Sequence, residues 1–180
     1  MNIIVVGCGK IGTTIIQSLV NEEHNVTVID NNPEVISRIT NIFDIMGVCG
    51  NGADCEVLTE ANVSSSSLVV ATTNSDEVNM LCCFLAKKLG TKNSIARIRN
   101  PEYNDSSLNF MKQQLDISLA INPEMLAARE LFNILKLPSA IKIETFSVRN
   151  FEMIELKLKI ILFLMGLFYL NSETNIKHHF

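Results

Sequence analysis

Residues 2–12 read NIIVVGCGKIG, and this stretch decides the fold. Its first part, Asn2–Val6, ends in four β-branched apolar residues, which is typical of a parallel strand buried on both faces. Its second part has glycines at the spacing G-x-G-x-x-G. Apolar side chains follow at helical spacing, at Ile11, Ile15, Ile16, Leu19 and Val20. This order predicts a strand, a glycine-rich turn and a helix that lies on a sheet.

The glycine-rich turn predicts a phosphate site built from backbone. Gly7 permits a tight turn, Gly9 lets the main chain approach a diphosphate, and Gly12 lets the helix pack close to the strand. The N–H groups and the positive end of the helix would then face the anion. The predicted phosphate-binding residues are Gly7, Cys8, Gly9, Lys10, Ile11 and Gly12.

Asp30 ends the second predicted strand, eighteen residues after Gly12. A carboxylate there can accept hydrogen bonds from both hydroxyls of a ribose and would repel a 2′-phosphate. No Arg or Lys follows directly, so the sequence favours NAD(H) over NADP(H). The alternative is that Asp30 serves as the N-cap of the next helix.

Strands and helices alternate over residues 1–137. Such repeated β-α-β units predict an α/β, Rossmann-like, doubly wound parallel sheet of six strands. The predicted strands are Asn2–Val6, Val26–Ile29, Ile45–Cys49, Leu68–Ala71, Ser94–Ile98 and Leu119–Ile121. The predicted helices begin after the glycine-rich turn, at Asn32-Pro33, near Asp54, near Asp76, near Leu108 and at Asn122-Pro123.

Residues 138–180 differ in character and are predicted to be a short β-rich, apolar extension. Two strand-like pieces, Ile141–Val148 and Met153–Lys157, flank an Arg149-Asn150 turn. The apolar stretch Ile160–Leu170 falls short of the roughly 20 residues that a membrane-spanning helix needs. We therefore expect a linker and the start of a truncated or atypical C-terminal module, with no transmembrane segment.

Further polar residues are expected at the carboxyl ends of later strands. Thr73 and Asn74 follow the fourth strand, where open α/β sheets bind ligands, although an ordinary turn is the alternative. Arg97 and Arg99 end the fifth strand on the same side. A buried arginine there needs an anionic partner, either a ligand phosphate or a carboxylate such as Asp76 or Glu77.

Composition excludes several classes of function. The 180 residues carry a net charge of −4, which provides no basic footprint for nucleic acid. The five cysteines show no C-x-x-C pair, which disfavours a disulfide framework or a zinc site and fits a reducing cytoplasm. None of the three histidines follows a predicted strand, and no catalytic motif is found. A binding module is therefore favoured over an enzyme. The alternatives are a small NAD-dependent oxidoreductase and a structural assembly piece.

Five blocks of sequence resemble one known family: MNIIVVGCGKIGTTI, VIDNN, GNGAD, ATTNSDEVNM and IARIRNPEY. They are similar to the N-terminal nucleotide-binding domain of regulatory subunits of bacterial Trk potassium-uptake systems, the TrkA-N or RCK/KTN class. The resemblance covers about residues 1–150.

The resemblance implies a cytoplasmic domain that binds NAD(H), or ATP or ADP. It also implies a homo-oligomer, dimeric or larger, held at the inner face of the plasma membrane by a potassium transporter of the Trk type. By the same resemblance, the residues that hold the dinucleotide are the turn Gly7–Gly12, Asp30, Thr73, Asn74 and Arg97. Asn51 and Arg99 are further candidates.

Overall fold

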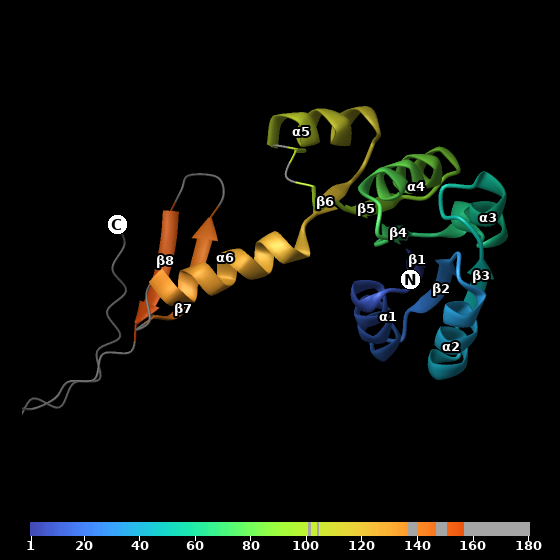
Figure 1. Ribbon diagram of the computed structural model, residues 1–180, viewed down its shortest axis with the longest axis horizontal. Coiled ribbons are helices and arrows are strands. Elements are labelled where there is room, and N and C mark those ends of the chain that lie inside the picture. Colours follow the sequence, from blue (N-terminus) through green and yellow to red (C-terminus); the bar gives the residue numbers. More distant parts are fainter. Residues whose placement is uncertain (101, 104, 137–139, 147–150, 157–180) are drawn as a thin grey trace, which may run out of the picture. The chain divides into compact units, whose positions relative to one another are not determined.

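Six parallel strands form the framework of residues 1–124 in the computed structural model (Figure 1). The structure describes residues 1–100, 102–103, 105–136, 140–146 and 151–156. The strand order is β3-β2-β1-β4-β5-β6, which is the order of a doubly wound nucleotide-binding sheet. The predicted Rossmann-like fold class is thus confirmed. The strands are β1 (Asn2–Val6), β2 (Asn25–Asp30), β3 (Met46–Cys49), β4 (Leu68–Ala71), β5 (Asn93–Arg97) and β6 (Leu119–Ile121).

Helices connect these strands where the sequence predicts them. They are α1 (Lys10–Asn21), α2 (Pro33–Phe43), α3 (Cys55–Glu60), α4 (Asp76–Lys88) and α5 (Asp105–Gln114). The segment between α3 and β4 is not only a loop. It contains a 3-10 turn, η1 (Val63–Ser65), which follows Asn62 in the left-handed conformation at φ 59°.

Alternation along β1 divides the core into two layers. Ile3 and Val5 pack with buried residues of α1 and α2 on one face of the sheet. Ile4 and Val6 pack with residues of α3 and α4 on the other face (Figure 1). A strand covered on both faces must be apolar throughout, which explains the β-branched run that opens the chain. Both cysteines of α4, Cys82 and Cys83, are fully buried in this second layer.

The topology brings the carboxyl ends of β1 and β4 together. From β1 the chain continues to β2 on one side, whereas β4 pairs with β1 on the other side. The two crossovers therefore diverge at this point and leave a crevice above the strand ends.

The residues after Glu124 form a second compact unit. Helix α6 (Pro123–Lys136) begins at the boundary, and β7 (Ala140–Phe146) pairs antiparallel with β8 (Phe151–Leu156). The two predicted strand-like pieces are thus strands. The predicted turn at 149–150 and the apolar stretch at 160–170 lie outside the described residues. A domain division after residue 137 stays a prediction.

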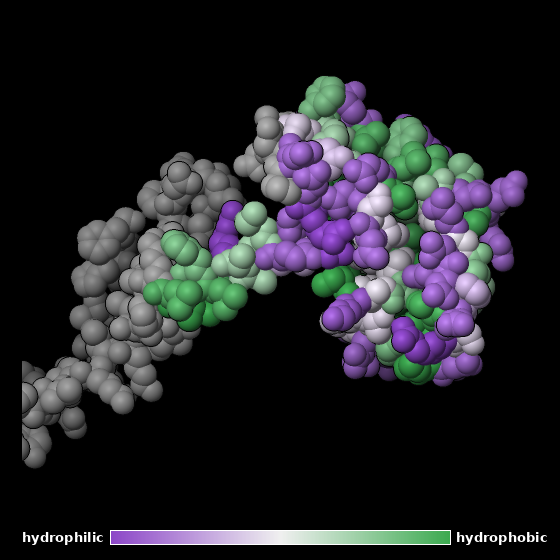
Figure 2. Space-filling model, in the orientation of Figure 1, coloured by the Kyte–Doolittle hydropathy of each residue, from purple (hydrophilic) through white to green (hydrophobic). Residues whose placement is uncertain are grey.

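Helix α6 carries many exposed apolar side chains, which form a hydrophobic stretch in Figure 2. These side chains are Met125, Leu126, Leu131, Phe132, Ile134 and Leu135. Among the residues that the structure describes, no helix combines the length and apolar character needed to cross a membrane.

Candidate functional site

A cleft of about 1160 Å³ opens at the carboxyl ends of β1, β2 and β4. The glycine-rich turn forms its floor, and side chains of α1 and α2 extend its wall. Seven of the predicted site residues line the cleft together: Gly7, Cys8, Gly9, Lys10, Asp30, Thr73 and Asn74. Asn51 also lines it, whereas Ile11, Gly12 and Arg97 are not part of the lining.

Each glycine of the turn occupies a different environment. Gly7 has φ +91°, and a Cβ there would lie 2.8 Å from the backbone nitrogen of Thr73. A Cβ on Gly12 would lie 1.9 Å from the carbonyl oxygen of Gly7, so α1 packs against the turn at a distance only glycine permits. By contrast, a Cβ on Gly9 would meet nothing within 4 Å. The main chain at Gly9 is therefore open to an approaching group.

The N-terminus of α1 differs from those of the next three helices. Helices α2, α3 and α4 are capped by the side chains of Asn32, Asp54 and Ser75, and each has an acidic residue in its first turn. Helix α1 begins after Gly9 with no side-chain cap and no acidic residue in its first turn. Its free N–H groups and the positive end of its dipole are thus left for an anion.

Asp30 is held beside the glycine-rich turn. Its Oδ2 accepts a hydrogen bond from the Cys8 N–H at 2.7 Å, and its Oδ1 accepts one from the Asn32 N–H at 2.9 Å. The alternative role of Asp30 as helix cap is wrong, because Asn32 caps α2 by accepting from the N–H of Glu34. A carboxylate has about four lone-pair sites, so Asp30 can still accept hydrogen bonds from ligand hydroxyls.

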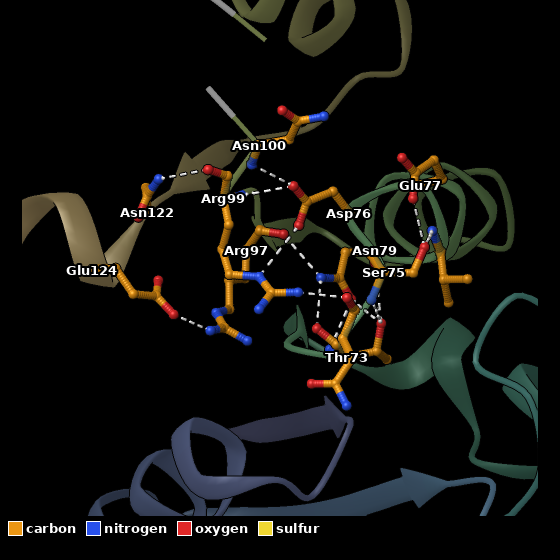
Figure 3. A network of polar contacts seen from close by, with 12 residues as sticks. Thr73, Ser75, Asp76, Glu77, Asn79, Arg97, Arg99, Asn100, Asn122 and Glu124 are labelled. Atoms are coloured by element: carbon orange, nitrogen blue, oxygen red, sulfur yellow. Dashed lines mark hydrogen bonds and ion pairs between the residues drawn. The ribbon is translucent and has the colours of Figure 1, made fainter. Parts of the chain in front are cut away.

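Asn79 fixes the far side of the cleft, and sequence reasoning missed it (Figure 3). It is fully buried in α4. Its Oδ1 accepts hydrogen bonds from the Thr73 N–H at 2.8 Å and the Thr73 hydroxyl at 2.7 Å, and its Nδ2 donates to the Arg97 carbonyl at 2.9 Å. The ends of β4 and β5 are therefore tied together. A buried amide in an apolar helix face was the available signal.

The two arginines at the end of β5 have partners. Arg97 is 7% exposed and pairs with Glu124 (Figure 3). The sequence did not predict this partner. Partial burial raises the pKa of Glu124, but the hydrogen bond and charge of Arg97 outweigh it and lower the pKa overall. Arg99 places its Nε 3.8 Å from Asp76 Oδ1, and it also donates to the Asn74 carbonyl. For Arg99, the predicted carboxylate partner Asp76 is confirmed.

The described side chains that line the cleft are suited to binding a ligand. Its titratable side chains are Cys8, Lys10, Asp30 and Arg38. Burial, reinforced by the negative charge of Asp30, raises the pKa of Cys8 to about 12, so this thiol stays protonated near neutral pH. The cleft can therefore hold an anion at the helix end and hydroxyl groups at Asp30, and its one described thiol is a poor nucleophile.

Fold and cleft together define a Rossmann-type α/β domain with a ligand crevice at the topological switch point. The TrkA-N domain family matches residues 3–123, and the chain belongs to this family. The resemblance in the sequence is thus confirmed.

Known proteins agree with this assignment. A Trk system potassium uptake protein TrkA homolog from Archaeoglobus fulgidus is 35% identical over 157 residues, which cover 87% of this chain and 35% of the relative. The chain thus spans about a third of the length of that relative.

Solved structures share the fold. The TrkA-N domain of the inner membrane protein ybaL from Escherichia coli has a TM-score of 0.65 at 17% identity, covering 74% of this chain and 96% of that domain. The GsuK channel bound to NAD has a TM-score of 0.57 at 20% identity, covering 67% of this chain and 21% of the channel.

Proposed function

We propose that this chain is a nucleotide-binding regulatory domain of a Trk-type potassium-uptake system, with NAD(H) as its ligand and ATP or ADP as competing occupants. One observation carries the proposal: the uncapped end of α1 and the carboxylate of Asp30 face the same cleft. The name of the relative from A. fulgidus supports the transport system. The NAD bound to the GsuK channel supports the choice of ligand.

In the proposed complex, the turn Gly7–Gly12 holds the diphosphate through its N–H groups, with Lys10 adding a positive charge. Asp30 accepts hydrogen bonds from ribose hydroxyls. Thr73 and Asn74 contact the ligand from the rim of β4. Arg97 stays a predicted phosphate ligand. To contact a phosphate, its side chain would have to break the ion pair with Glu124.

The proposed role is regulation, not catalysis. Hydride transfer to a carbonyl needs a proton donor near the nicotinamide, and a thiol whose pKa is near 12 is a weak one. A nucleotide regulates by binding one of two conformations more tightly, and it shifts their populations only by that difference in affinity. The hydrogen bonds of Asn79 to Thr73 and Arg97 hold the ends of β4 and β5 together. This rigid edge of the cleft can transmit a difference in nucleotide affinity to the rest of the domain.

We also propose that the chain works as a homo-oligomer at the cytoplasmic face of a membrane, docked to its potassium transporter. The exposed apolar side chains of α6 support this, because such a stretch is unfavourable in water and is covered in an assembly. A second copy can supply the covering surface by two-fold symmetry.

Titration of the full chain with NADH, NAD⁺, ATP and ADP by calorimetry tests the ligand. We expect Asp30→Ala to weaken NADH binding about tenfold, as the loss of a charge-assisted hydrogen bond predicts. Asp54→Ala is the matched control, because Asp54 caps α3 outside the lining of the cleft. Failure of every adenine nucleotide to bind at millimolar concentration would contradict the proposal.

The assembly is tested by native mass spectrometry. We expect a dimer or larger oligomer, and we expect Leu135→Glu to shift the mass toward the monomer, because Leu135 is 76% exposed on α6. A wild-type chain that is monomeric at micromolar concentration, alone and with NADH, would contradict this part. Steady NADH oxidation with a panel of carbonyl substrates would instead favour the oxidoreductase alternative.

A further inference from the structure

Both basic side chains of the first sixty residues lie in the cleft. These residues contain two cations, Lys10 and Arg38, against eight carboxylates. Lys10 and Arg38 both line the cleft, whereas Asp30 is the one carboxylate of that set in its described lining. The two positively charged side chains of residues 1–60 therefore both lie at the cleft. Lys10 belongs to the glycine-rich turn, but the role of Arg38 is not explained by that turn.

Arg38 has no structural partner among the described residues. It makes no ion pair or hydrogen bond in that part of the chain, and its side chain is exposed. Arg97 and Arg99, by contrast, are both engaged by carboxylates. An arginine that lines a cleft without a protein anion is available to an anion of the ligand.

Arg38 lines the cleft from the helix that follows Asp30. Helix α2 begins directly after Asp30, Asn31 and Asn32, and Arg38 lies in its second turn. The charge of Arg38 opposes the rise in the pKa of the Cys8 thiol, so Arg38 lies within electrostatic reach of Cys8. Cys8 in turn donates its N–H to Asp30. Arg38 and Asp30 therefore line the same cleft, and each of them acts on Cys8.

Asp30 is also less repulsive to an anion than its charge alone implies. Each of its two oxygens already accepts a backbone hydrogen bond, from Cys8 and from Asn32. These N–H groups offset part of the negative charge on the carboxylate.

We infer that Arg38 is a specificity-determining residue, which binds a phosphate on the 2′ position of the adenosine ribose and lets the cleft accept NADP(H) beside NAD(H). This inference rests on the proposed function, because it needs the ribose at Asp30. The residues directly after Asp30, Asn31 and Asn32, carry no positive charge, but Arg38 lies on the helix that follows them. The helix brings a cation to that end of the cleft from farther along the chain.

Competitive and direct titrations of the full chain with NADH and NADPH test this inference. The chain has no tryptophan, so the fluorescence of the reduced nicotinamide reports both ligands with the same signal and little protein background. The variant is Arg38→Gln, and the measured quantity is the ratio of the NADPH and NADH affinities. Because a charge-assisted hydrogen bond is lost, we expect this ratio to fall about tenfold. Arg38→Lys keeps the charge without the fork of donors and should give an intermediate ratio.

Lys10→Gln is the matched control, since it removes the other cation of the same cleft. We expect it to weaken both ligands together and leave their ratio unchanged. If NADH binds but Arg38→Gln leaves the ratio as in the wild type, or if Lys10→Gln lowers the ratio equally, the inference is overturned. If neither dinucleotide binds and ATP and ADP also fail, the proposed function itself is wrong. Binding of 2′,5′-ADP that depends on Arg38 would support the inference independently of the nicotinamide.

Discussion

Replacement of Gly12 by alanine tests how tightly α1 is packed on the glycine-rich turn. The added Cβ would lie 1.9 Å from the carbonyl oxygen of Gly7 and 3.0 Å from the hydroxyl of Thr72. The first neighbour is backbone, so no change of rotamer can relieve the contact. Helix α1 must move away from β1, or the turn must deform.

The expected loss of stability is a difference of two terms. Overpacking costs about 1–3 kcal/mol, and a contact with backbone belongs at the top of that range. Alanine regains about 1 kcal/mol of helix propensity over glycine. The net loss is about 2 kcal/mol, which corresponds to a fall in Tm of about 4–8 °C for a chain of this size.

Urea and thermal unfolding, followed by circular dichroism, measure this loss. Gly9→Ala is the matched control, because its Cβ would meet nothing within 4 Å and its φ of −68° suits alanine. The control should lose less than about 1 kcal/mol, the range for an N-cap position, while it weakens nucleotide binding by placing a methyl group in the cleft. A Gly12→Ala protein as stable as the Gly9→Ala protein would refute the packing argument.

Three further predictions follow from the described contacts. Asn79→Ala should lower the free energy of unfolding by about 2–3 kcal/mol in urea titrations, because it leaves the partly buried Thr73 N–H without an acceptor and removes the buried hydrogen bond to the Arg97 carbonyl. An unchanged urea midpoint would contradict the stabilising role of the Asn79 hydrogen bonds. Asn32→Ala should cost about 1 kcal/mol by the same measurement, as the loss of a helix cap does, and Asn41→Ala on the exposed side of α2 should cost less. Iodoacetamide at pH 8 should alkylate the exposed Cys49 and Cys55 in the folded chain, and mass spectrometry reads the sites. Burial raises the pKa of the other three thiols, which should react only after unfolding, namely Cys8, Cys82 and Cys83. Rapid labelling of these buried thiols without denaturant would contradict the description of the core.

The elements of the sheet could be predicted because their signals are local. Runs of β-branched residues mark the strands, and the bounds of β1, β4 and β6 agree with the prediction to the residue. Asn32-Pro33 marks the start of α2 in the same local way, since a capping side chain and a fixed φ act within one turn. The parallel sheet followed from the repeated β-α-β units, whereas the order of its strands was not predicted.

Most contacts at the carboxyl ends of β4 and β5 could not be predicted, because they join residues far apart in the chain; the pairing of Arg99 with Asp76 is the exception. Period-two alternation placed Arg97 and Arg99 on the same side, but β5 ends at Arg97 and the rule stops there. The pairing of Arg97 with Glu124 depends on where α6 begins relative to β5. For Arg38, the sequence predicts that the residue lies on a helix. It does not show that this helix forms a wall of the cleft and that Arg38 lines it.

Under the proposed function, the missing side-chain cap of α1 links folding to the supply of nucleotide. An anion that occupies this helix end completes hydrogen bonds that neighbouring helices obtain from their own side chains. Such a ligand binds the folded chain and not the unfolded one, so at a hundred times its dissociation constant it adds about 2.7 kcal/mol to the stability. In a cell short of that nucleotide, less of the protein would survive proteolysis, and under the proposed function its abundance would follow the concentration of its ligand.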